Sequence, residues 1–469
     1  MKQYEFGIVG LGVMGRNLLF NMADHGYAVA GLDLDQDKVN ALHTEATDKQ
    51  DVQGKTSANE FVGLLKSPRA ILLLVPAGKP VDGAIASLTP FLEKGDIIVD
   101  GGNSYFTDTE RRFKELEEKG IHFFGMGISG GEEGARFGPS MMPGGDPAAY
   151  ERLRPVFEAI AAKVNGEPCV TYMGTGSAGH YVKMVHNGIE YGIMQLISEM
   201  YDLLKRGLNY SDDQLQQTFE SWNEGELKSF LLEITGIVLK KVDDETGNRL
   251  VNMILDVARA KGTGKWTSQN AMDIQAAIPV IDTAVAMRDL SKYKEERVKA
   301  AEKLVWNNTE NDTDAHGGLI EHIKKAYHFA VLTIYAQGMA QLQLASKEYG
   351  YGLKLADIAK IWRGGCIIRS TTLEDLMQAY LKDPELPNLM LDDVIAGKLV
   401  NTQEGARFSV KFAVDKGIPA PALMSALGYF DAYRSARLAT NIIQAQRDYF
   451  GAHTYERTDK EGKFHTQWD

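Results

Sequence analysis

The sequence predicts an α/β domain with a doubly wound sheet, then a large all-α domain and an extended C-terminal tail. Short apolar runs alternate with helical patterns over the first third of the chain, helical periodicity dominates to about residue 440, and the last segment is polar and aromatic. Strands that alternate with helices form right-handed βαβ units and an open parallel sheet. We expect domains at residues 1–177 and 178–440 and a tail at 441–469.

Continuous apolar runs mark the expected strands, as is typical of parallel strands buried on both faces. They lie at residues 6–9, 28–32, 71–75, 96–99, 123–126 and 169–173. Between them, residues 17–25 and 150–163 show helical periodicity. Strand-like runs end after about Met173, so the sheet is expected to end there.

Three long helices are predicted beyond the sheet, because apolar residues recur there at spacings of three and four. They lie at residues 181–204, 319–348 and 421–437, and the first follows a glycine-rich stretch at 174–179 that suits a domain junction. The polar segment 307–318 is expected to be a loop. Residues 444–469 are expected to form an extended tail, and such tails are ordered only when they dock on something.

Composition and net charge exclude several classes of protein. The 469 residues are 44% hydrophobic and 24% charged, and the apolar runs are too short to cross a bilayer. The N-terminus lacks a signal-peptide layout, and Cys169 and Cys366 cannot build a disulfide framework, so a cytoplasmic protein is expected. A net charge of −12 disfavours nucleic acid, and an anionic small substrate would need a local cluster of cations.

A glycine-rich turn follows the first predicted strand and opens a helix. It comprises Gly10, Leu11, Gly12, Val13, Met14 and Gly15. In a Rossmann-like domain the first glycine makes the tight turn, the second admits a pyrophosphate, and the third lets helix and strand pack closely. We therefore predict a dinucleotide site. A turn that serves packing alone is the alternative.

The second strand ends in Asp33, Leu34 and Asp35. An acid about 20 residues beyond the glycine turn accepts hydrogen bonds from the ribose hydroxyls of NAD and would repel the 2′-phosphate of NADP. The nearest cation is Lys38. NAD is therefore the expected cofactor, the alternative being a solvated strand end or a helix N-cap.

One helical face gathers groups suited to acid–base chemistry. Lys183, His186, Asn187, Glu190 and Tyr191 are offset by 0, 3, 4, 7 and 8 positions and so share one stripe of a helix. The face offers a base, an acid and several hydrogen-bond donors. The alternative is a solvated polar face, which rarely mixes these residue types so closely.

Two glycine-containing loops are further candidates. Lys261 and Thr263 stand among glycines that would let an anion approach the backbone, although the spacing is not that of a Walker A motif and a plain surface loop is the alternative. Gly130 and Gly131 follow a predicted strand and could place N–H groups beside a substrate. No zinc or calcium spacing occurs, so no metal is expected.

Taken together, six segments resemble the 6-phosphogluconate dehydrogenases over essentially the whole chain. They are residues 10–15, 100–103, 128–134, 179–191, 261–267 and 444–453. The helix motif and the tail motif are highly specific to that family. The wider β-hydroxyacid dehydrogenases share the glycine turn, the Gly-Gly-Asn-like and Ser-Gly-Gly elements and the helix lysine.

The resemblance implies a metal-free oxidative decarboxylation of 6-phospho-D-gluconate to ribulose 5-phosphate in the pentose phosphate pathway, by a homodimer. It implies Lys183 as general base and Glu190 as general acid. It also implies a larger set of ligand contacts. The sugar acid would meet Ser129, Gly130, Gly131, His186 and Asn187, with Asn103 near both ligands; the phosphate end would meet Tyr191, Lys261, Thr263, Arg288 and, from the partner subunit, Arg447, with His453 of the partner subunit completing the site.

Two segments depart from the commoner family pattern. NADP-dependent members typically carry Asn-Arg-Ser or Asn-Arg-Thr where this chain has residues 33–35, and often Val-Lys-Ala where it has Val75, Pro76 and Ala77. A cation is missing at both places, which favours NAD. Burial and neighbouring cations such as His186 and Lys261 are expected to lower the pKa of Lys183 so that it can act as a base.

Two rival functions are also compatible with the sequence. One is another β-hydroxyacid dehydrogenase, although those chains are much shorter and lack the tail motif. The other is a catalytically silent dinucleotide-binding protein, which the pairing of Lys183 with Glu190 on one face disfavours.

Overall fold

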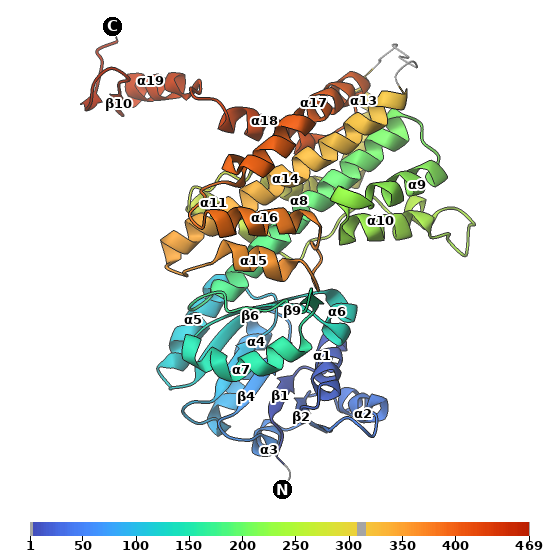
Figure 1. The fold of residues 1–469 in the computed structure, drawn as a ribbon, viewed down its shortest axis with the longest axis vertical. Helices are drawn as coiled ribbons and strands as arrows, with labels where there is room; N and C mark the ends of the chain where they lie inside the picture. The colour runs from blue at the N-terminus through green and yellow to red at the C-terminus, as the bar shows by residue number, and fades with distance from the viewer. Residues whose placement is uncertain (1–2, 307–315, 469) are drawn as a thin grey trace.

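The computed structural model describes residues 3–306 and 316–468. Figure 1 shows a sheet-containing region, a layer of long helices stacked on it, and an arm that carries the C-terminus away from both. The α/β domain followed by a helical domain is therefore as predicted.

A seven-stranded sheet with the order β3-β2-β1-β4-β5-β6-β7 organises the first region. Strands β1 to β6 are parallel, and β7 pairs with β6 in the antiparallel sense. The strands are β1 (Phe6–Val9), β2 (Val29–Leu32), β3 (Val52–Lys55), β4 (Ala70–Leu73), β5 (Ile97–Asp100), β6 (His122–Ser129) and β7 (Ser140–Gly144).

Helices cover both faces of this sheet. They are α1 (Val13–Asp24), α2 (Gln36–Glu45), α3 (Ala58–Leu64), α4 (Lys79–Leu88), α5 (Phe106–Glu117), α6 (Gly131–Phe137) and α7 (Pro147–Ile160), with a 3₁₀ turn at Thr89–Phe91. Neighbouring strand residues enter different cores: Ile8 and Val99 lie in one, and Val9 and Ile98 in the other. Burial on both faces explains why the strands are continuous apolar runs.

The strand prediction is wrong in three places. The runs at β3 and β7 are interrupted by polar residues, glycine or proline, and neither strand was predicted. The predicted strand 169–173 is not one, because β7 fills the place beside β6 and this segment makes only isolated bridges such as Met141 to Val170. A short hairpin with two residues in each strand, β8 (Lys163–Val164) and β9 (Glu167–Pro168), precedes it. The sheet is thus mixed rather than wholly parallel.

The second region is helical. Its elements are α8 (Ala178–Asp202) with a π-helical turn at Leu203–Gly207, α9 (Asp212–Trp222), α10 (Phe230–Lys240), α11 (Thr263–Asp273), α12 (Pro279–Ser291), α13 (Lys294–Lys303), α14 (His316–Tyr349), α15 (Leu355–Trp362), α16 (Thr372–Lys382), α17 (Asp393–Lys416) and α18 (Pro421–Tyr433), with 3₁₀ turns at Gly225–Leu227, Leu250–Asn252 and Leu389–Leu391. Most of the predicted loop 307–318 lies outside the described residues, and its last three residues begin α14.

Helix α8 lies directly on the sheet because glycines remove the side chains between them. A Cβ at Gly127 of β6 would stand 2.3 Å from the Cβ of Lys183, and one at Gly179 would stand 2.2 Å from the backbone oxygen of Gly125. Non-bonded atoms do not approach each other this closely, so only glycine fits at either position. The sheet therefore fixes the position of the first turns of α8 and of Lys183.

The tail is folded rather than extended throughout. It contains α19 (Thr440–Gly451) and a hairpin of β10 (Tyr455–Glu456) with β11 (Lys463–Phe464). The carboxylate of Asp448 accepts hydrogen bonds from the backbone of Thr454 and Thr466 and from the indole of Trp468. These contacts fold the tail on itself, and Figure 1 shows the resulting arm projecting beyond α18.

A buried carboxylate joins α8 to the helix that leads into the arm. Glu199 accepts the backbone N–H groups of Ala422 and Leu423 at 2.8 and 2.9 Å, at the start of α18. Burial raises the pKa of Glu199 to about 7, although these hydrogen bonds and one from Gln195 act in the opposite direction.

We expect Glu199→Gln to flatten the pH dependence of unfolding. The folded state holds the Glu199 proton more tightly than the unfolded state. The free energy of unfolding should therefore be higher at pH 5 and fall by up to about 3 kcal/mol as the pH rises through 7. Glutamine has no such proton and carries only a pH-independent cost. Urea midpoints of both proteins from pH 5 to 8 test this, and parallel profiles would contradict it.

In the part of the chain that the structure describes, no helix is both long and apolar enough to cross a membrane.

Candidate active site

The glycine turn has the geometry of a pyrophosphate cradle. Gly10 has a φ of 95°, and a Cβ there would stand 2.4 Å from the backbone oxygen of Leu74. A Cβ on Gly15 would stand 1.8 Å from the oxygen of Gly10, whereas one on Gly12 would meet only open space. Helix α1 begins directly after Gly12 without a side-chain cap, so its N–H groups face that space. The residues present therefore fit a dinucleotide.

Asp33 lies at the carboxyl end of β2, beside the glycine turn. Its carboxylate accepts the N–H of Leu11 at 2.8 Å and that of Asp35 at 3.0 Å, and Lys38 Nζ stands 3.4 Å away. Leu34 is 91% exposed. Asp35 caps α2 by accepting the N–H of Asp37, so the helix-cap alternative holds for Asp35.

Two further loops end at the same edge of the sheet. Val75, Pro76 and Ala77 follow β4, with Pro76 and Ala77 exposed. Asn103 follows β5 and is also exposed. The loop after β4 lies next to the glycine turn and the loop after β5 lies one strand further on, because β1, β4 and β5 are consecutive in the sheet. The structure thus brings the predicted cofactor residues to one edge.

The predicted polar stripe of α8 faces inward. Lys183 is 6% exposed and His186 is 0% exposed, whereas Asn187 and Glu190 are half-buried. The opposite face, with residues such as Val185, belongs to the helical core. The alternative of a solvated polar face is therefore wrong.

Burial moves the lysine and the glutamate of this stripe toward unusual protonation states. It lowers the pKa of Lys183, an effect that the negative charge of Glu190 opposes. It raises the pKa of Glu190, against the positive charges of Lys183 and Arg288. These shifts favour a neutral amine and a protonated carboxyl, the forms that a base and an acid need.

His186 is not the cation that we expected beside the lysine. Burial, together with the charge of Lys183, lowers the pKa of His186 well below its usual range, so the imidazole is neutral. Its Nδ1 lies 2.9 Å from Asn187 Oδ1 and its Nε2 lies 3.4 Å from Ser129 Oγ. Lys261 is exposed, so burial rather than neighbouring cations lowers the pKa of Lys183.

The Ser129-Gly130-Gly131 segment stands where β6 ends and α6 begins. Gly130 has a φ of 124° and Gly131 a φ of 63°, backbone conformations that favour glycine. A Cβ on Gly130 would stand 2.8 Å from the oxygen of Gly365. The segment therefore exposes the N-terminus of α6 beside His186.

The second cluster of predicted residues gathers at the start of α11. Asn187 Nδ2 donates to Thr263 Oγ1 at 3.2 Å, and Thr263 is the first residue of that helix. The guanidinium carbon of Arg288 lies 3.3 Å from the ring centroid of Tyr191. Lys261 stands two residues before Thr263, in the exposed approach to the helix.

Arg447 and His453 are not brought to this site within one chain. Arg447 lies on α19 and donates to Gln444, and His453 packs against Phe450. Figure 1 places α19 on the arm, away from the sheet and from the start of α8.

Sequence reasoning missed the segment that supports Ser129 and His186. It joins α15 to α16: the N–H of Ile367 lies 3.4 Å from Ser129 Oγ, and just before it Trp362, the last residue of α15, makes an edge-on contact with the His186 ring. The glycine pair at 364–365 was the one feature of the sequence that could have indicated this segment, because the backbone of Gly365 lies so close to that of Gly138 that only glycine fits.

No group of three His, Cys, Asp or Glu side chains with a metal-binding arrangement occurs within residues 3–306 and 316–468.

A dinucleotide cradle, together with the buried Lys183 and the half-buried Glu190 where the sheet meets the helices, defines a dinucleotide-dependent dehydrogenase. Comparisons with known proteins make this specific. Residues 5–174 match the family model for the NAD binding domain of 6-phosphogluconate dehydrogenase, and residues 179–468 match the model for the C-terminal domain.

Full-length relatives agree with these matches. The chain is 52% identical to a Bacillus subtilis NADP(+)-dependent, decarboxylating 6-phosphogluconate dehydrogenase and 49% identical to the decarboxylating enzyme of Escherichia coli, with both chains covered in full in each case. A solved Plasmodium falciparum 6-phosphogluconate dehydrogenase, described in apo form and with its cofactor NADP+ or its substrate, is 42% identical and has a TM-score of 0.96, covering 99% of this chain and 100% of that one. The chain belongs to the decarboxylating 6-phosphogluconate dehydrogenase family.

Proposed function

We propose that this enzyme oxidises and decarboxylates 6-phospho-D-gluconate with Lys183 as base and Glu190 as acid, and that it prefers NAD. One observation carries the residue roles: burial moves the pKa of Lys183 down and that of Glu190 up on the same helical face. A solvated ion pair would have both groups charged and could not begin the reaction.

The proposed chemistry needs two states of Lys183. The neutral amine takes the proton of the substrate's C3 hydroxyl, and the bound dinucleotide supplies the hydride acceptor. The β-keto acid then loses carbon dioxide, and the protonated Lys183 donates to the developing enolate oxygen. Glu190 protonates C1 of the enediol and so releases the ketose.

The sugar acid would lie between α8 and the start of α6. Ser129, Gly130 and Gly131 would offer a hydroxyl and backbone N–H groups, and the neutral His186 with Asn187 would position the hydroxyls. The backbone N–H groups of the Ser129-Gly130-Gly131 segment would suit the C1 carboxylate. Asn103, on the facing loop, would contact both ligands.

The phosphate end would lie near Thr263 and Arg288. Tyr191 holds the Arg288 guanidinium on its ring face and thereby orients it. Lys261, exposed before α11, could close on the phosphate. Together they supply the local positive charge that an anionic substrate of an acidic protein requires.

The arm is proposed to complete the site of a second subunit in a homodimer. Its contacts are almost entirely its own, yet Ile442, Ile443, Tyr449 and Phe450 are all more than half exposed. Such apolar exposure marks an interaction surface. Residues 441–469 would then act as a unit distinct from the units 1–177 and 178–440, carrying Arg447 and His453 to the partner.

NAD preference is proposed from the surroundings of Asp33. The carboxylate is held in place by two backbone N–H groups, so turning it away to admit a 2′-phosphate would break both hydrogen bonds. At a few ångströms and an effective dielectric near 20, like charges repel by about 4 kcal/mol per pair. Lys38 offsets part of this repulsion. The Bacillus subtilis relative is named NADP(+)-dependent, so the preference calls for a direct test.

We expect kcat/KM for NAD to exceed that for NADP by about 10- to 1,000-fold, since each 1.4 kcal/mol corresponds to tenfold. Replacing Asp33-Leu34-Asp35 with Asn-Arg-Ser should shift the preference toward NADP, because it removes the repulsion and adds a cation. Steady-state kinetics with both cofactors measure this. Ser retains the α2 cap, so stability serves as the control, and a native preference for NADP would refute the proposal.

The reaction itself is tested by nicotinamide absorbance with 6-phosphogluconate and each cofactor, together with detection of carbon dioxide and ribulose 5-phosphate. Reduction without carbon dioxide release would point to a simple β-hydroxyacid dehydrogenase. An inert protein that binds the dinucleotide would point to a silent binding protein.

A further inference from the structure

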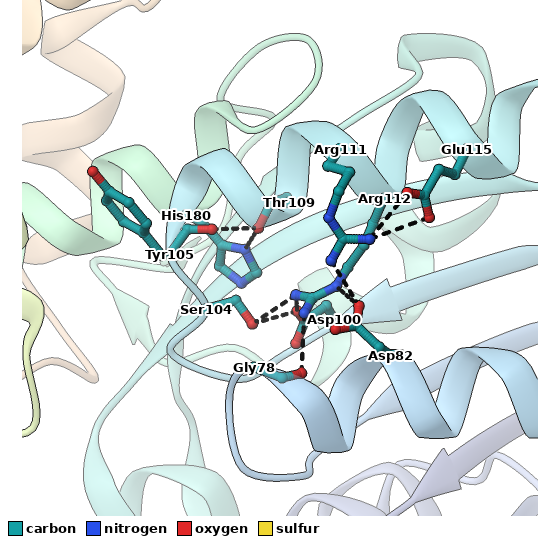
Figure 2. Close-up of polar contacts among 10 residues, drawn as sticks. All are labelled: Gly78, Asp82, Asp100, Ser104, Tyr105, Thr109, Arg111, Arg112, Glu115 and His180. Atoms are coloured by element: carbon teal, nitrogen blue, oxygen red, sulfur yellow. Dashed lines mark hydrogen bonds and ion pairs between the residues drawn. The ribbon is translucent and has the colours of Figure 1, made fainter.

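Arg112, on α5, is a buried arginine that the reaction proposed above does not use. Its side chain is 1% exposed. Figure 2 shows its guanidinium between the loops that follow β4 and β5, with hydrogen bonds or ion pairs to both sides. Because a guanidinium is always charged and presents five N–H donors in a fixed plane, it can hold several acceptors in one geometry.

The first loop is the one that carries Val75, Pro76 and Ala77. Arg112 NH2 donates to the backbone oxygen of Gly78 at 3.0 Å, directly after these residues. Arg112 Nε donates to Asp82 Oδ1 at 2.8 Å, in the first turn of α4. The end of this loop is therefore tied to α5.

The second loop carries Asn103. Asp100, which is 0% exposed, accepts the N–H of Gly102 at 3.0 Å and the hydroxyl of Ser104 at 2.6 Å. Arg112 NH1 lies 3.5 Å from both Asp100 Oδ2 and Ser104 Oγ. The exposed Asn103 thus stands on a short turn, and the buried Asp100 and Arg112 hold the residues on either side of it.

Strand order indicates which half of a dinucleotide these loops would meet. The glycine turn after β1 takes the pyrophosphate, and Asp33 directly after β2 marks the adenosine side. Strands β4 and β5 lie on the other side of β1, so the nicotinamide half extends over their loops. This is also the side on which α8 places Lys183.

We propose that Arg112 is a positioning residue that holds the loops after β4 and β5 in the arrangement that binds the nicotinamide half of the cofactor. The inference rests on the proposed function. In a buried ion pair, the cost of removing both charges from water usually cancels most of their attraction. The cluster therefore contributes little to net stability, and its main effect is to fix the geometry of the loops. The same helix also touches α8, because Thr109 Oγ1 lies 2.7 Å from Nδ1 of the buried His180, one turn before Lys183.

The test compares a full dinucleotide with its adenosine half. In Arg112→Met, which keeps an unbranched apolar stem, we expect the Kd of NADH to rise about tenfold or more, as expected for lost charge-assisted hydrogen bonds. The Kd of ADP-ribose should stay within about twofold, because its contacts at the glycine turn and Asp33 are untouched. Tryptophan quenching or calorimetry on the full-length protein measures both, with NADPH and 2′-phospho-ADP-ribose as the pair if the native enzyme prefers NADP.

Arg111→Met is the matched control. Arg111 also donates to Asp82 Oδ1, at 2.9 Å, and otherwise pairs with the exposed Glu115. It should leave both affinities unchanged. Ser104→Ala and Arg112→Lys extend the test if Arg112→Met does not fold: both should weaken NADH binding and leave ADP-ribose binding unchanged.

Equal weakening of NADH and ADP-ribose would show a merely structural role and overturn the inference, as would unchanged NADH binding in every folded variant. These measurements use no substrate. A native protein that fails to oxidise 6-phosphogluconate would therefore refute the proposed function by a separate result.

Discussion

Lys183→Met is expected to lower kcat by at least about 10²-fold, the usual lower range for a positioned general base, while dinucleotide binding stays nearly native. Methionine fills the space of the lysine stem but can neither take the C3 proton nor donate to the enolate oxygen. Because Lys183 is buried against Gly127, water cannot take its place easily.

Steady-state absorbance kinetics measure kcat, and NADH titration measures dinucleotide binding. Lys265→Met is the matched control, since Lys265 is an exposed lysine of α11 and should retain native kcat. If Lys183→Met kept more than about a tenth of native kcat, the assignment of Lys183 as the base would be wrong.

Loss of the arm is expected to abolish turnover and leave dinucleotide binding in place. A chain that ends after Thr440 lacks Arg447 and His453 but keeps the whole sheet and α8. The exposed apolar side chains of α19 leave with it, so the proposed dimer should also weaken. Activity, dinucleotide titration and sedimentation of the truncated protein test each part.

Subunit mixing separates site sharing from folding. Arg447→Ala and Lys183→Met should each be inactive, yet a heterodimer of the two holds one site with both residues intact. At complete exchange half of the dimers are mixed, and each has one working site, so activity should return to about a quarter of native. If exchange is demonstrated by tagged chains and no activity returns, the arm does not serve the partner's site.

The sequence predicted the five strands that are continuous apolar runs, the pattern typical of strands buried on both faces. The runs at β1, β2, β4, β5 and β6 are apolar and continuous for that reason. It failed at β3, an edge strand whose Gln53 and Lys55 break the run, and at β7, whose Pro143 argues against a strand. The segment 169–173 is as apolar as a strand, but it packs beside β7 without a continuous ladder, and only the tertiary arrangement decides this.

The site was predictable where its residues share one local element. The stripe from Lys183 to Tyr191 follows from helical spacing, and the glycine turn from its place between strand and helix. The support for Ser129 from Ile367 was not, because the contact spans more than two hundred residues. The neutral state of His186 also escaped prediction, since it depends on burial that only the packed structure provides.

The close approach of α8 to the sheet limits how this enzyme can be recombined with its relatives. With no room for a Cβ at Gly125, Gly127 or Gly179, the glycines of one region and the lysine of the next must be inherited together. A chimaera joined between residues 174 and 179 would combine the sheet of one enzyme with the α8 of another, and these two surfaces would not be complementary. The transferable unit is therefore the sheet with the first turns of α8, a segment that straddles the border at which sequence comparisons divide the chain.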